Sequence, residues 1–321
     1  GVLPPPVIAA TQIDNVTVPF VSPQGFTGSL QALQENAIAG GFFDSPLVDS
    51  DGVFRRAPLV QRYDGNLYPS LALAIARVAL NEPEISLGFA GTDDYSGINL
   101  ETFKLGDIAI PVDEQVAVFI PYRGPQESFR FISAKEVLAG DVPRDALQGR
   151  IALLGASAAG LLDLRSTPVG QRYIGVEAHA NLIAGLIDGD IRRQPSYSDG
   201  LELFLIFIIA LLTALLFPRL GPILGLSLVV GILIAMAAIN FWMWSSLMLV
   251  IPLASILGYT LFAALLHISY GFFVEQRNKR HLSNIFGQYI PPSVVEEIDV
   301  AGEEVSLEGE TREMSVLFSD V

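Results

Sequence analysis

The sequence predicts an α/β domain over residues 1–200 followed by three transmembrane α-helices over residues 201–274. Two patterns support this prediction. In the first part, short apolar runs typical of strands alternate with longer runs typical of helices. In the second part, three long apolar segments carry almost no charge. The chain is 51% hydrophobic and 17% charged, so a polar domain, a membrane block and a polar tail share one chain.

Composition excludes several classes of function. A net charge of −15 argues against nucleic-acid binding, which requires a basic surface. The absence of cysteine excludes a disulfide framework, a zinc–thiolate site and a cysteine nucleophile. The chain begins with Gly1 and shows no signal peptide or early membrane helix. We therefore expect a fragment truncated at both ends, with an upstream segment that carries residues 1–200 across the membrane.

The first 200 residues interleave predicted strands and helices. Pro69 precedes a predicted helix, and Gly189 follows another, as is typical of helix starts and ends. We expect an α/β domain whose sheet is covered and largely buried. The elements in chain order are apolar runs at 7–10 and 37–42, a helix at 71–80, a strand at 115–120, a short helix at 135–138, a buried strand at 151–154 and a helix at 176–187.

Residues 155–160 have the glycine spacing of a phosphate-binding loop and follow a predicted strand. Leu161 and Leu162 stand where that motif needs Lys and Ser or Thr. Without the lysine nothing reaches the terminal phosphates, so we interpret the segment as a tight turn that glycine permits.

Asp49, Asp51 and Gly52 begin like a calcium-binding loop. The twelfth position of such a loop needs a glutamate and holds Val60 instead. We therefore interpret the segment as a turn before Val53.

Glu177 and His179 lie near the start of the last predicted helix of this domain. We interpret them as a satisfied cap or a surface pair, with a role as ligands for a bound group as the alternative.

Three segments are predicted to span a membrane: 201–217, 222–243 and 247–274. A hydrocarbon core of about 30 Å needs roughly 20 helical residues. Residues 218–222 and 240–246 are the expected connections, and the tryptophans of the second suit a membrane interface. Glu202 lies at the edge of the first span, and His267 lies inside the third, where we expect it to be packed. Spans without charge favour an anchor and signal conduit over a transporter.

The basic residues near the span ends predict the orientation of the chain. Two basic residues, Arg192 and Arg193, lie near the span ends on the side of the first domain. Four basic residues lie near the span ends on the opposite side. We therefore expect the tail in the cytoplasm and residues 1–200 outside. The basic residues of the cytoplasmic side are Arg219, Arg277, Lys279 and Arg280.

Four patches of the first domain, in the same order, resemble the type-two CHASE extracellular sensor domain. That family has a membrane helix and an opening strand before the region matched here, and three membrane helices after it. Its ligands are largely undefined, so the resemblance assigns no sensing residue, and the extracytoplasmic stimulus stays unknown. The patches are 41–59 with DSDGVFRRAP, 68–74 with YPSLALA, 163–170 with DLRSTPVG and 175–181 with GVEAHAN.

The tail after the third span divides into two parts. Residues 275–310 form a predicted transducer segment, in which 275–284 continue the helix of the third span and 293–298 form a short helix. Ser293 and Glu296 have the spacing of a capping box for that short helix. Residues 311–321 form a predicted strand.

This tail resembles the lead-in and first strand of a class III nucleotide cyclase. The carrying residues are 286–298 and the run MSVLFSDV at 314–321. The resemblance implies the C-terminal start of an α/β, ferredoxin-like cyclase domain. It also implies that Asp320 is a metal ligand and that the backbone carbonyl of Val321 helps to hold a second ion. Two Mg²⁺ or Mn²⁺ ions would activate the ribose hydroxyl and neutralise the phosphates, and the second aspartate would lie beyond residue 321.

Together these resemblances imply a multi-pass receptor of the bacterial inner membrane, embedded in lipid. We expect the intact protein to be a homodimer that makes cyclic AMP from ATP, or cyclic GMP from GTP, with release of pyrophosphate. The fragment itself is expected to be inactive, because most of the catalytic domain is missing. The alternative is a receptor of the same extracellular family with a kinase or other non-cyclase output. His281 lies in a helix-compatible stretch, but the run at 314–320 does not fit a kinase.

Overall fold

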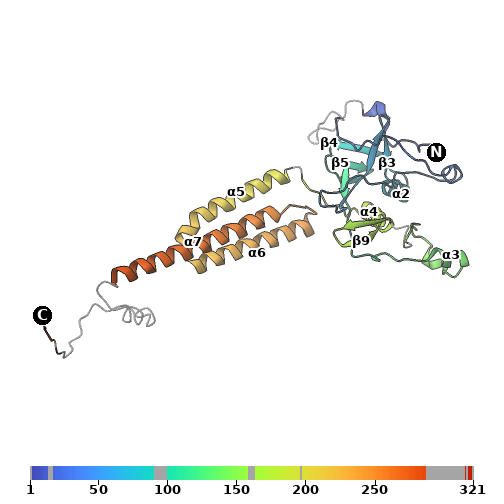
Figure 1. Cartoon of the computed structure of the whole chain (residues 1–321). Coiled ribbons are helices and arrows are strands. Elements are labelled where there is room, and N and C mark those ends of the chain that lie inside the picture. Colours follow the sequence, from blue (N-terminus) through green and yellow to red (C-terminus); the bar gives the residue numbers. More distant parts are fainter. Residues whose placement is uncertain are drawn as a thin grey trace. The chain divides into compact units, whose positions relative to one another are not determined.

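The computed structural model describes residues 2–13, 17–89, 100–157, 163–195, 197–286, 315 and 317–319. The chain divides into two compact units. The first comprises Gly1–Glu202 with Met236–Leu253, and the second comprises Leu203–Ala235 with Ala254–Val321. Residues 1–202 form a domain of mixed strands and helices, whereas helices dominate the rest of the described chain (Figure 1).

The strands of the first unit form small antiparallel sheets, so the prediction of one covered sheet is wrong. Two-residue turns join β2 to β3, β5 to β6 and β8 to β9, and such turns produce antiparallel hairpins and not parallel crossovers, whereas β1 pairs with the distant β7. Asp64 and Gly65 both have positive φ, as the tight turn between β2 and β3 requires. In the described residues the sheets are β1 (Arg56–Pro58) with β7 (Ala117–Phe119), β2 (Val60–Tyr63) with β3 (Asn66–Pro69), β4 (Ile85–Phe89) with β5 (Leu100–Leu105) and β6 (Ile108–Pro111), and β8 (Leu164–Thr167) with β9 (Gly170–Ile174).

Two helices form the centre of the domain. Helix α2 (Leu71–Ala79) confirms the helix predicted at 71–80, and α4 (Gly175–Asp188) confirms the one predicted at 176–187. Gly189 ends α4 in the left-handed conformation that was expected of it. The smaller helices are η1 (Ala10–Gln12), α1 (Gln31–Gln34), α3 (Ala134–Ala139) and η2 (Arg144–Ala146).

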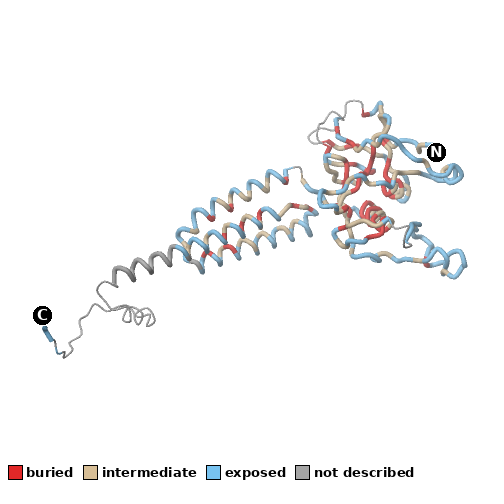
Figure 2. The backbone as a smooth tube through the Cα atoms, in the orientation of Figure 1, coloured by how far each residue is buried: buried red, intermediate tan, exposed pale blue. Residues whose placement is uncertain are grey.

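Helices α2 and α4 pack against each other and against the hairpins to build one hydrophobic core. Figure 2 shows the buried stretches concentrated in these elements. Burial of large apolar side chains is the main favourable term for such a domain. Fully buried members include Leu59, Leu67, Leu73, Phe103, Leu105, Ile110, Tyr173, Leu182 and Leu186.

The strand predicted at 151–154 is not formed, and that prediction is wrong. Residues 151–154 have no regular secondary structure, and the side chains of Ile151 and Leu154 are 49% and 90% exposed. An apolar run becomes a strand only when a neighbouring strand satisfies its backbone. The run at 7–10 is also not a full strand, since Ile8 makes a single antiparallel bridge with Leu67.

In the part of the chain that the structure describes, three helices are long and apolar enough to cross a membrane, as predicted. They are α5 (Ser198–Leu216), followed by η3 (Phe217–Arg219), α6 (Pro222–Ser246) and α7 (Ala254–Phe286). Many of their leucine and phenylalanine side chains are exposed in the chain, as lipid-facing side chains are.

The connection between α6 and α7 lies later than predicted. Residues 240–246 are helical, and the turn comprises 247–253. Met248 has a positive φ of 53°, which ends α6, and Pro252 disfavours helix in the residue before it. The third helix therefore begins at Ala254 and not at residue 247. It continues through 275–284 to Phe286, which confirms the predicted helical extension of the third span.

We predict that Ser70→Ala destabilises the sensor domain by about 1 kcal/mol, a loss of a few degrees in Tm. Ser70 caps α2 by accepting a hydrogen bond from the Leu73 N–H at 3.2 Å, and Ser70 is buried. Thermal unfolding of the full chain in nanodiscs would measure the effect. Ser133→Ala is the matched control, since Ser133 is the N-cap of α3 but makes no side-chain cap bond. Equal shifts for the two variants would contradict the capping role.

Candidate functional site

Residues 49–52 form a turn, as predicted. The Gly52 N–H donates to the Asp49 C=O at 2.8 Å, and Gly52 has a φ of +77°. The Asp51 Oδ1 accepts a hydrogen bond from the Val53 N–H at 3.0 Å. Asp51 therefore uses its side chain for the turn itself, which is a common role of aspartate at this position.

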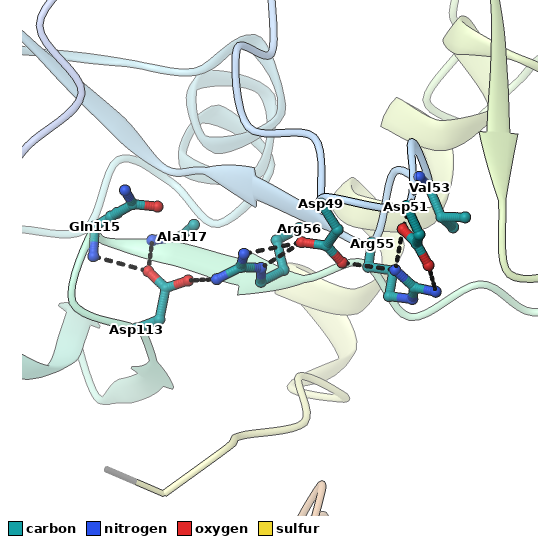
Figure 3. A network of polar contacts seen from close by, with 8 residues as sticks. All are labelled: Asp49, Asp51, Val53, Arg55, Arg56, Asp113, Gln115 and Ala117. Carbon is teal, nitrogen blue, oxygen red and sulfur yellow. Dashed lines mark hydrogen bonds and ion pairs between the residues drawn. The ribbon is translucent and has the colours of Figure 1, made fainter. Parts of the chain in front are cut away.

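The carboxylates of the two aspartates in this turn form ion pairs with arginines and do not form a metal-binding site. Arg55 donates to Asp49 at 2.8 Å and to Asp51 at 2.7 Å, and Arg56 donates to Asp49 at 2.9 Å and to Asp113 at 2.8 Å (Figure 3). The hydrogen bond from Arg55 lowers the pKa of Asp51 to about 2. Burial of Asp49 opposes its ionisation, but the hydrogen bonds from both arginines outweigh burial and lower its pKa. The interpretation as a turn, and not as a calcium loop, therefore fits the structure.

Asp113 extends this network to the loop before β7. Its Oδ1 accepts hydrogen bonds from the N–H groups of Gln115 and Ala117, both at 2.9 Å (Figure 3). Arg56 lies on β1, which pairs with β7. The charges thus fix the register of a short two-stranded sheet, although partial exposure to water limits their energetic contribution.

A small cavity lies at the start of α4. Phe42, Phe54, Asp163, Arg165 and His179 are among its lining residues. Its volume of about 20 Å³ holds roughly one water molecule. The hydroxyl of Ser45, another lining residue, is buried and has no hydrogen-bond partner among the described residues. The cavity lining therefore combines apolar side chains with several polar and charged groups.

His179 is the titratable group of this cavity. Burial lowers the pKa of His179 below 6.5, against the opposing effects of the Phe43 backbone, which accepts a hydrogen bond, and of the Asp163 carboxylate. Asp163 is already paired with Arg165 at 3.0 Å. The backbone of Gly175 comes so close to this carboxylate that a Cβ there would lie 2.2 Å from Oδ2 of Asp163. The imidazole is therefore held neutral in a closely packed site.

Glu177 is a buried carboxylate with 2% exposure. It accepts hydrogen bonds from the backbone N–H groups of Glu127 at 3.1 Å, Ser128 at 2.8 Å and Phe129 at 3.4 Å. Glu177 lies in the first turn of α4, where the helix dipole also favours a negative charge. Glu177 is therefore satisfied, but by a distant loop: α4 has no side-chain cap bond and Glu177 is buried, so the interpretation as a helix cap or a surface pair is wrong.

Asn181, one helical turn later, completes this arrangement. It donates to the Tyr173 hydroxyl and to the Glu177 C=O, each at 2.8 Å, and accepts from the Arg123 N–H at 2.9 Å. Tyr122 packs edge-on against Tyr173 at 5.3 Å. This network was not predicted from the sequence. Its signal was two polar residues spaced i, i+4 on an otherwise apolar helix.

The glycine-rich segment 155–160 is described up to residue 157. At Gly155 a Cβ would lie 2.5 Å from the Cβ of Val176, so glycine lets this loop approach the start of α4. This close approach agrees with the interpretation as a turn. Residues 158–162 lie outside the described part.

Asp320 and Val321, the predicted metal ligands, lie outside the described residues. Ser315 and residues 317–319 have no regular secondary structure, and the other residues of the strand predicted at 311–321 lie outside the described part, so that strand stays a prediction. Leu317 and Phe318 are 92% and 93% exposed. Within the described parts of the chain, no three His, Cys, Asp or Glu residues group closely enough to hold a metal ion.

His267 is a packed histidine, as predicted. Its ring stacks on Phe217 with centroids 4.2 Å apart and an interplanar angle of 28°. A Cβ on Gly225 would lie 2.4 Å from Nε2 of His267, so the two helices meet closely at this point.

We predict that Glu177→Gln destabilises the sensor domain by about 2 kcal/mol. The carboxylate, a charged acceptor, is replaced by a neutral amide, and the N–H₂ group of that amide faces backbone N–H donors with which it cannot form a hydrogen bond. The loop at 127–129 should become accessible to proteases in the full chain. Limited proteolysis and thermal unfolding measure both effects. Glu127→Gln, on the same loop, should change neither. Wild-type resistance in Glu177→Gln would show that the carboxylate does not hold the loop.

We predict that the stability of the sensor domain falls as the pH drops from 7 to 5. His179 has a lowered pKa when folded, so the unfolded state binds the proton more readily and gains from acid. The slope cannot exceed about 1.4 kcal/mol per pH unit for one proton. Unfolding measured against pH should show the slope in wild type and in His267→Gln but not in His179→Gln. An unchanged slope in His179→Gln would assign it to other groups.

The comparisons with known proteins identify the first domain. The CHASE2 domain family matches residues 7–215. No curated protein and no solved structure matches the chain. The matched region contains the mixed sensor domain and reaches into α5, and three helices able to span a membrane follow the sensor. The chain is a transmembrane signal receptor of the multi-pass type, and it belongs to the CHASE2 domain family.

Proposed function

We propose that this receptor acts in a bacterial inner membrane through a class III nucleotide cyclase output. The resemblance of residues 286–298 and 314–321 to that enzyme supports the output. The proposed reaction is the formation of cyclic AMP from ATP, or of cyclic GMP from GTP, with pyrophosphate as the second product.

The observation that carries the proposal is the continuity of α7. This helix has 33 residues from Ala254 to Phe286, which corresponds to roughly 50 Å at 1.5 Å per residue. Its apolar span, Ala254–Gly271, takes only 18 of them. The helix contains no proline, the residue that most often kinks or breaks a helix. A continuous helix therefore joins the membrane span to the segment that resembles a cyclase transducer.

The polar side chains inside the spans support a role as anchor and conduit. Thr213 donates to the Ile209 C=O and Thr260 to the Ile256 C=O, both at 2.8 Å. These bonds satisfy each hydroxyl within its own helix. An ion pathway would instead need polar groups directed toward a shared route.

In this proposal the carboxylate of Asp320 and the backbone carbonyl of Val321 hold divalent ions. Mg²⁺ or Mn²⁺ would neutralise charge on the triphosphate when bound. Hard oxygen ligands of this type suit either ion. The second carboxylate would come from the parent gene beyond Val321. Because class III sites form between two catalytic domains, the active receptor would be a homodimer.

We predict that Asp320→Asn lowers cyclic nucleotide synthesis by the full-length product of the parent gene by at least about 100-fold. Mutation of residues that only hydrogen-bond to a metal ligand already lowers metal affinity or activity by about 10–100-fold. Glu310→Gln, ten residues earlier in an acidic stretch, should stay within about twofold of wild type. The assay uses membranes, ATP or GTP with Mn²⁺, and mass spectrometry of the product. No cyclic nucleotide from wild-type membranes with either substrate would overturn the proposal. So would a parent gene that lacks a second aspartate after residue 321.

A further inference from the structure

The segment that leaves the sensor domain pairs with the turn between α6 and α7. Arg193 forms a parallel bridge with Leu249. The Arg193 N–H donates to the Met248 C=O, and the Val250 N–H donates to the Arg193 C=O, both at 2.9 Å. The two segments belong to the same compact unit of the chain. We call residues 190–194 the exit segment and residues 247–253 the turn.

Side chains reinforce this backbone pairing. The guanidinium of Arg192 lies 4.4 Å from the ring centroid of Trp244, near the end of α6, a distance typical of cation–π contacts. Arg192 also pairs with Asp190 at 3.1 Å. This arginine was one of two basic residues that opposed the predicted orientation. Its charge serves a contact at the end of a membrane helix, where tryptophan is common.

The turn is also fixed from its own side. The N–H groups of Leu247 and Leu249 both donate to the Met243 C=O at 3.1 Å. Asn240 reaches from α6 to the Ile251 C=O at 3.1 Å. Apolar residues of both segments are buried: Ile191 of the exit segment, and Leu249 and Ile251 of the turn. The turn is thus ordered by its own hydrogen bonds and by burial, and it leads directly to Ala254, where α7 begins.

We propose that the exit segment and the turn form a clamp through which the sensor domain acts directly on the start of α7. Along the chain, a displacement of the sensor would have to pass through α5 and α6 to reach α7. The clamp shortens this route, because the exit segment bonds directly to Val250, four residues before Ala254. Movement at the end of α4 would reach the start of α7 through the two backbone hydrogen bonds to the turn, while the contact of Arg192 with Trp244 holds the exit segment to the end of α6. This inference does not depend on the type of output domain.

The absence of cysteine allows a direct test by crosslinking. Bridged residues have Cα atoms close enough for a disulfide. The double variant Arg193→Cys with Leu249→Cys, in the full chain in membrane vesicles, should therefore crosslink efficiently under mild oxidation. Gln194→Cys with Leu249→Cys is the control, since neighbouring strand residues point to opposite faces. Non-reducing peptide mass spectrometry measures the yield. Equal yields from the two pairs would overturn the clamp.

A second measurement tests the action on α7. Val250→Pro removes the N–H that donates to Arg193, whereas Val250→Ala keeps it. A nitroxide on Ser255→Cys, in the exposed first turn of α7, should become more mobile with Val250→Pro and not with Val250→Ala. A nitroxide on Ile223→Cys, at the start of α6, should respond to neither and shows that the helices remain folded. If the Ser255 label has the same mobility in both Val250 variants, the clamp does not hold α7 and the proposal fails.

Discussion

The burial of Glu177 at the start of α4 is the interaction on which the sensor domain most depends. A carboxylate in a nearly dry site is costly unless donors compensate it, and here three backbone N–H groups and the helix N-terminus do so. The same bonds order a loop that would otherwise expose its backbone. Asn181 repeats the arrangement one turn later. Helix α4 is therefore both a core helix and the support for the loop at 123–129, and its first turn also lines the cavity of His179.

Sequence patterns were sufficient for elements whose determinants are local. Helix α2 follows from an apolar run just after Pro69, α4 from an apolar run ended by Gly189, and the spans from length and hydropathy alone. The sheets were not predicted correctly, because strand pairing depends on partners elsewhere in the chain. The hairpin at Asp64 and Gly65 was recognisable in principle from its turn residues. The apolar run at 151–154 was not distinguishable from a strand, since only its exposure shows that it lacks a partner.

In the candidate site, too, features with local determinants could be predicted from the sequence and contacts between distant segments could not. At the Asp49 turn, the sequence contained the answer in the two adjacent arginines, which compete with any cation for the same carboxylates. The place of Glu177 near a helix start could be predicted from the sequence, but its role in binding a loop, and the partners there, could not. They lie on a loop about fifty residues away in the chain, and no local spacing encodes that contact. The pairing of Arg193 with Leu249 could not be predicted from the sequence either, because these residues are also far apart in the chain.

A receptor with three spans must carry a movement across the bilayer through helices that lack strong polar contacts in their interiors. Apolar side chains in lipid provide little directional force, because lipid tails satisfy them as well as a neighbouring helix does. Rigid transmission therefore has to come from backbone continuity and from polar contacts at the membrane surface. This chain has both at α7: an unbroken helix to Phe286, and a start point adjacent to the hydrogen-bonded turn. Helix α5 is joined to the exit segment by the chain itself and by one hydrogen bond from the Gln194 side chain to the Ser198 hydroxyl. It would then act mainly as an anchor, and α7 as the helix that moves.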